Sequence, residues 1–98
     1  GRYWMLTSSD VLAVVPDVVS RLNAGELVVV LPQAGKFFVL NGPGADTFQL
    51  LDGQRSLAKI AVARQACYED IPLEQVQADV LSLARKLLAR GAVRVVSD

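Results

Sequence analysis

The hydrophobic pattern of this 98-residue chain changes its period once, and that change limits the folds that the chain can adopt. Apolar and β-branched residues form three strand-length runs, at residues 18–22, 27–31 and 36–40. Short clusters of turn-forming residues separate the runs, so we expect an antiparallel meander of three strands. Beyond the third run, the apolar residues recur at helical spacing instead.

Three helices are expected after the strands. Pro43 favours the start of the first helix, which Gly53 is expected to end. Ser56 is a good N-cap for the second helix. Pro72 is expected to begin the third and longest helix, which Gly91 ends, and residues 93–96 then predict a short final strand. The pattern therefore predicts an α+β fold of three antiparallel strands, three helices and a short C-terminal strand.

The first fifteen residues show little periodicity, so we expect residues 1–15 to form a weakly structured arm and residues 16–98 to form the domain. The arm begins with an apolar head that includes Tyr3 and Trp4, and a polar stretch follows. It could be disordered, or its head could pack on the domain or on a second copy. A homodimer is therefore one of the open alternatives.

Composition argues against several classes of function. Ten basic residues balance ten acidic ones, so no overall charge attracts nucleic acid or a membrane surface. No apolar run approaches the roughly 20 residues of a membrane span. A single cysteine, Cys67, fits a reducing compartment, and we expect a cytoplasmic protein.

The side chains that commonly support catalysis are missing or isolated. The chain has no histidine, which is the commonest general base and metal ligand. Cys67 falls on the apolar face of the second helix, so we expect a buried structural thiol there. That face is expected to carry Leu57, Ile60, Ala61, Cys67 and Tyr68. We therefore expect no catalytic residues, no metal site, no cofactor and no enzymatic activity.

The third helix has an apolar face of roughly 160°, wider than one core contact requires. The small domain could simply wrap much of the helix. Alternatively, Leu81 and Leu88 at one border of this face could line a groove, with Gln77 and Arg85 on its rim.

Four parts of the sequence stand out together by their order and spacing: Phe38-Val39-Leu40-Asn41, Leu50-Leu51-Asp52-Gly53-Gln54-Arg55-Ser56, Ala78-Asp79-Val80 with Leu83 and Leu87, and Arg90-Gly91-Ala92-Val93. Together they resemble the PqqD-like family of leader-recognition domains, which serve pathways that modify ribosomally made peptides. The resemblance covers about residues 18–96 and implies a winged-helix-like fold. Gln33 follows Pro32 where the quinone-cofactor branch typically has Glu, so the third strand looks more like the free-standing subunits of lasso-peptide pathways.

The resemblance also implies a function and a site. A precursor's leader peptide is expected to add a strand beside the third strand and to lie against the third helix. The expected binding residues are Lys36, Phe37, Phe38, Val39, Leu40, Asn41, Gln77, Leu81, Arg85 and Leu88. The expected partners are the leader peptide and a leader peptidase, cyclase or radical enzyme of the same pathway.

Two other functions stay open at this stage. One is a peptide chaperone of the PqqD type in pyrroloquinoline quinone synthesis. The other is a winged-helix DNA-binding regulator, because one architecture can support both peptide and DNA binding. The expected third helix carries Glu74 and Asp79 toward its N-terminus, where a recognition helix normally presents basic or amide groups, so DNA binding is less favoured.

Overall fold

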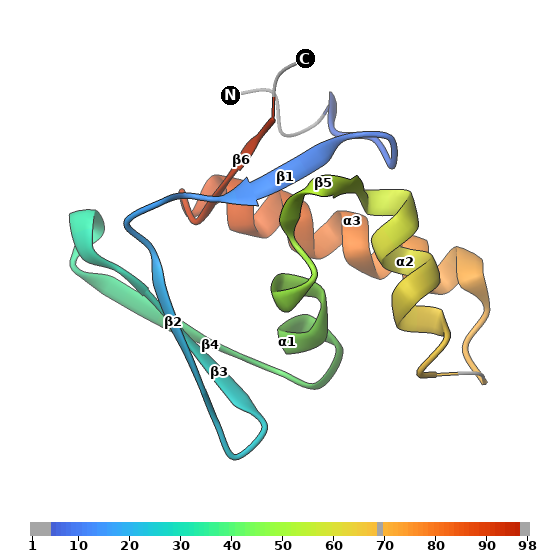
Figure 1. The fold of residues 1–98 in the computed structure, drawn as a ribbon, viewed down its shortest axis with the longest axis horizontal. Helices are drawn as coiled ribbons and strands as arrows, with labels where there is room; N and C mark the ends of the chain where they lie inside the picture. Colours follow the sequence, from blue (N-terminus) through green and yellow to red (C-terminus); the bar gives the residue numbers. More distant parts are fainter. Residues whose placement is uncertain (1–4, 69, 97–98) are drawn as a thin grey trace.

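The computed structural model describes residues 5–68 and 70–96 and divides their strands between two small sheets. The elements follow in the order β1 (Val11–Val14), β2 (Val19–Asn23), β3 (Glu26–Leu31), the 3-10 turn η2 (Pro32–Ala34), β4 (Lys36–Asn41), α1 (Gly42–Gln49), β5 (Asp52–Ser56), α2 (Leu57–Gln65), α3 (Leu73–Ala89) and β6 (Val93–Val95). One sheet has the order β5-β1-β6 and the other the order β2-β3-β4. In Figure 1, β2, β3 and β4 extend away from the helices, whereas β1 and β6 lie beside α3.

The sheet β2-β3-β4 is the meander that the three apolar runs predicted. Its pairing is antiparallel and continuous, from Glu26 opposite Asn41 to Leu31 opposite Lys36 along β3 and β4. Successive side chains alternate between faces, so Leu27, Val29 and Leu31 all lie on one face and are buried in the core. The intervening valines of β3 lie on the other face, which is more open. The α+β architecture expected from the sequence, with antiparallel strands, three helices and a C-terminal strand, is confirmed.

Residues 5–15 belong to the body of the domain, so the expected weak structure is wrong for them. β1 is the central strand of its sheet, and Leu6 and Leu12 are buried in the core. The strand depends on β5 and β6, two short partners that lie far away in the sequence. The alternative that the apolar head packs on the domain therefore holds for Leu6, while Tyr3 and Trp4 lie outside the described residues.

β5 forms where no strand was expected. The first helix ends at Gln49 rather than at Gly53, which instead lies in β5 with a φ of +76°. A Cβ atom at Gly53 would lie 3.4 Å from the Cβ of Ala13 in β1, so glycine permits both the turn and the close approach. The polar sequence of β5 gives no strand signal, and its conformation comes from pairing with β1.

The second helix begins where the sequence predicted it. The Ser56 hydroxyl accepts a hydrogen bond from the Lys59 backbone N–H at 3.2 Å, which is an N-cap. The apolar residues of its first two turns are buried: Leu57, Ile60 and Ala61. The expectation of a buried Cys67 is wrong, because α2 ends at Gln65 and the helical spacing does not continue to the exposed thiol.

The loop after α2 is tied back to α1. The Tyr68 hydroxyl donates a hydrogen bond to the Asp46 carboxylate at 2.6 Å. This bond to a negative acceptor, together with partial desolvation, raises the pKa of Tyr68 above its ordinary value. Tyr68 is therefore a structural contact rather than a residue on the apolar face of α2.

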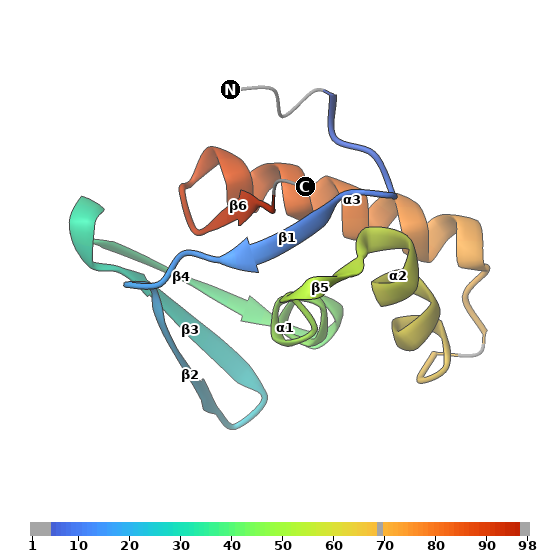
Figure 2. The same cartoon turned by 45° about the horizontal axis from the view of Figure 1, so that its top comes forward.

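The third helix crosses behind both α2 and the strand β1 (Figure 2). It has Pro72 as its N-cap residue and Arg90 as its C-cap residue, close to the expected bounds. Its centre faces the core through Val76, Val80, Ala84 and Leu87, which are almost completely buried. Of the helices in the described parts of the chain, none is long and apolar enough to cross a membrane.

Candidate functional site

β4 is an edge strand with six residues, about 20 Å long. All six residues face β3 in a continuous register. The opposite edge of β4 pairs with no other strand of the described chain. Such an edge presents backbone N–H and C=O groups that another extended segment can pair with.

The two faces of β4 differ in exposure. Phe38 and Leu40 are half-buried, and they lie opposite the buried residues of β3. Phe37 and Val39 point to the open face, with 69% and 44% of their surface exposed. The pattern settles which pair meets the core, a point that alternation alone left open.

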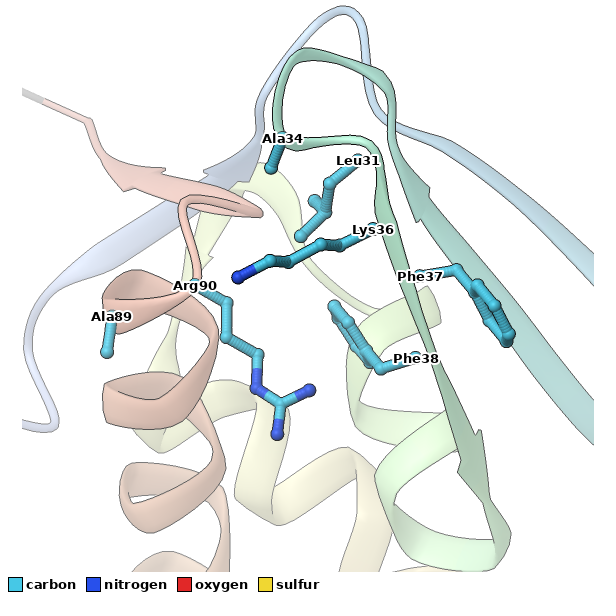
Figure 3. A pocket seen from close by; sticks show the side chains of 7 residues that line it. All are labelled: Leu31, Ala34, Lys36, Phe37, Phe38, Ala89 and Arg90. Atoms are coloured by element: carbon cyan, nitrogen blue, oxygen red, sulfur yellow. The ribbon is translucent and has the colours of Figure 1, made fainter.

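A cavity of about 410 Å³ lies between β4 and the C-terminal end of α3. Its lining residues are Leu31, Ala34, Lys36, Phe37, Phe38, Ala89 and Arg90. We call this space the β4–α3 groove. Figure 3 shows the ring of Phe38 turned into the groove and the ring of Phe37 turned away from it. A groove of this size beside a free strand edge can accept side chains of an extended segment.

Two basic side chains give the groove a positive charge. The Arg90 guanidinium carbon lies 4.9 Å from the centroid of the Phe38 ring, close enough for a cation–π contact. Lys36 extends into the same space from the first position of β4 (Figure 3). The residues that line the groove include no acidic side chain. The site therefore combines an aromatic surface, aliphatic side chains and two positive charges.

The structure places the expected site residues of β4 in or beside the groove, but not those of α3. Lys36, Phe37 and Phe38 line the groove, and Val39, Leu40 and Asn41 continue the same strand. The expected residues of α3 do not line it: Gln77, Leu81, Arg85 and Leu88. Leu88 is only 7% exposed and belongs to the core, so it offers no surface to a bound segment.

The expected residues of α3 lie away from the groove because the opposite border of the helix's apolar face meets β4. A Cβ atom at Gly44 would lie 3.6 Å from Leu40 and 4.0 Å from Leu83, which places Leu83 beside β4. At 100° per residue, Leu81 lies roughly 160° around the helix from Leu83. The border nearest β4 therefore runs from Leu83 to Arg90, and the expected border lies on the far flank. Sequence periodicity defines both borders but does not say which one faces the strand.

Comparisons with known proteins agree with this architecture. The family model "Coenzyme PQQ synthesis protein D (PqqD)" matches residues 26–93, well over half of the chain. A structure described as TbiB1 in complex with the TbiA(beta) leader peptide has a TM-score of 0.75 and 24% identity, covering 88% of this chain and 99% of that one. A solution structure of the PqqD truncation of Methylobacterium extorquens PqqCD, described as a stand-alone recognition element, has a TM-score of 0.80 and 21% identity. It covers 96% of this chain and 99% of that one. No curated protein matches the chain in sequence.

Proposed function

The chain belongs to the PqqD family, and on that premise we propose that it binds the leader segment of a ribosomally made precursor peptide. The leader pairs with the free edge of β4 as a fourth strand and places side chains in the β4–α3 groove. The domain then presents the bound precursor to a leader peptidase, a cyclase or a radical enzyme in the cytoplasm. The proposal is one of recognition rather than catalysis.

The observation that carries this proposal is the placement of a six-residue free edge beside a cavity. Backbone pairing along the edge supplies affinity that depends little on the leader's sequence. Side chains of an added strand alternate, so one set enters the groove near Phe38 and the other lies beside Phe37 and Val39. The two similar structures, a complex with a leader peptide and a stand-alone recognition element, support leader binding as the function.

The first test is a titration of the ¹⁵N-labelled chain with the leader of a precursor peptide encoded beside its gene. We expect the backbone amide shifts to concentrate in residues 36–41 and 83–90. Binding that perturbs α1 and α2 while β4 stays unchanged would contradict strand addition, even if the affinity were high.

A proline pair tests the backbone contact directly. In an edge strand, successive N–H groups alternate between the partner strand and the outside. Of Phe38→Pro and Val39→Pro, we expect one variant to lose stability and the other to keep its fold but bind the leader at least about tenfold more weakly. Phe38→Ala and Val39→Ala control for loss of the side chains. Two folded proline variants with unchanged affinity would exclude pairing along this edge.

A further inference from the structure

We propose that the β4–α3 groove selects peptides that carry an acidic side chain at the position entering it, held between Lys36 and Arg90. This inference rests on the proposed function and adds the chemical class of one peptide residue to it. Lys36 comes from the first residue of β4 and Arg90 from the C-cap of α3. Two cations from different elements therefore converge on one space beside the strand edge (Figure 3).

Neither cation has an ionic partner among the described residues. The salt bridge found in those residues joins Arg55 to Asp52, in β5. Asp17 lines an adjoining cavity together with Arg90 but forms no ion pair with it. Two like charges near one another raise each other's energy, and a carboxylate placed between them relieves that repulsion.

The lining of the groove suits the side chain of an Asp or Glu residue. The Arg90 guanidinium lies over the Phe38 ring, and no hydrogen bond or salt bridge among the described residues uses its N–H groups. The accessible aliphatic surface comes from Ala34 and Ala89, which are exposed, while Leu31 lies buried beneath them. An Asp or Glu in an added strand could contact this surface with its methylene groups while its carboxylate reaches the two cations.

The effect on affinity is expected to be moderate, because Lys36 and Arg90 are both exposed before the peptide binds. Exposed ion pairs contribute little, and the contribution grows when the bound strand excludes water. We therefore expect about a three- to tenfold preference for Glu over Gln at the position that enters the groove.

The test uses displayed random peptides long enough to span β4, selected against the intact chain. We expect an acidic residue to be enriched at one position, spaced alternately from apolar residues. One selected peptide and its Glu→Gln form are then compared on the wild type and on the variants Lys36→Gln, Arg90→Gln and the control Arg94→Gln. Arg94 is an exposed residue of the other sheet.

We expect the Glu preference to disappear in Lys36→Gln and Arg90→Gln and to persist in Arg94→Gln. Selected peptides that perturb the β4 amides without any acidic preference would overturn this inference and leave the proposed function intact. A preference lost equally in Arg94→Gln would show a general charge effect and would also overturn it. If no selected peptide perturbed β4, both the inference and the proposed function would fail.

Discussion

The two sheets of this domain each have three strands, but their edge strands differ in length and polarity. In the sheet β5-β1-β6, the central strand is deeply buried at Leu12. Of its edge strands, β5 has a polar sequence and β6 has only three residues. In the sheet β2-β3-β4, one face is open and the edge strand β4 runs for six residues with apolar side chains. Short or polar edges discourage pairing with another chain, whereas a long apolar edge invites it. The first sheet therefore stabilises the domain, and the second is suited to recognition.

The largest effect should come from the centre of the stabilising sheet. Leu12→Ala removes a completely buried side chain and leaves a cavity, so we expect the free energy of unfolding to fall by about 2–5 kcal/mol. Val30→Ala, on the open face of the other sheet, should cost less than about 1 kcal/mol. Urea unfolding measures both values, and equal losses would contradict the division between the sheets.

A smaller difference in stability is expected between substitutions on the two faces of β4. Phe38→Ala removes a half-buried ring and its contact with Arg90, and should lower the free energy of unfolding by about 1–3 kcal/mol. Phe37→Ala removes a ring that is 69% exposed, so its stability should be nearly unchanged. Thermal unfolding of the two variants, side by side, tests whether the strand has one structural face and one free face.

The smallest effect concerns the edge strand β5. The backbone N–H groups of Arg55 and Gln54 donate to the Asp52 carboxylate and hold its pKa below the ordinary value of 3.8. A lowered folded-state pKa stabilises the fold above the unfolded value, and this contribution is lost as the pH falls through the folded value. Asp52→Asn should therefore flatten the loss of thermal stability between about pH 5 and pH 2. Parallel acid curves for the variant and the wild type would contradict this account.

The meander and α3 could be predicted because each has a strong local signal. The β-branched residues of β3 and the helical spacing of Val76, Val80 and Leu87 indicate their elements before any tertiary contact is known. Ser56 likewise marked the start of α2 through the chemistry of its hydroxyl. The β4 half of the candidate site followed from the same local pattern, combined with a family resemblance.

The missed features all depend on distant partners. β5 is polar and became a strand because β1 lies beside it, while β1 itself is held between two segments from elsewhere in the chain. Cys67 was placed on a helical face that the helix never reaches, because α2 ends two residues earlier. Strand pairing and helix ends of this kind are decided by tertiary contacts that override local propensity.

The sequence by itself determined the family, the fold class and the strand that offers a free edge. Only the tertiary structure decided which border of α3 faces that strand, and so replaced Leu81 and Leu88 by Leu83 and Arg90 as the residues beside β4. A helical pattern defines an apolar arc about its own axis and contains no information on the rotation of that arc against a neighbour. That rotation is fixed by packing, and packing also brought Lys36 and Arg90 to the same groove from positions far apart in the chain.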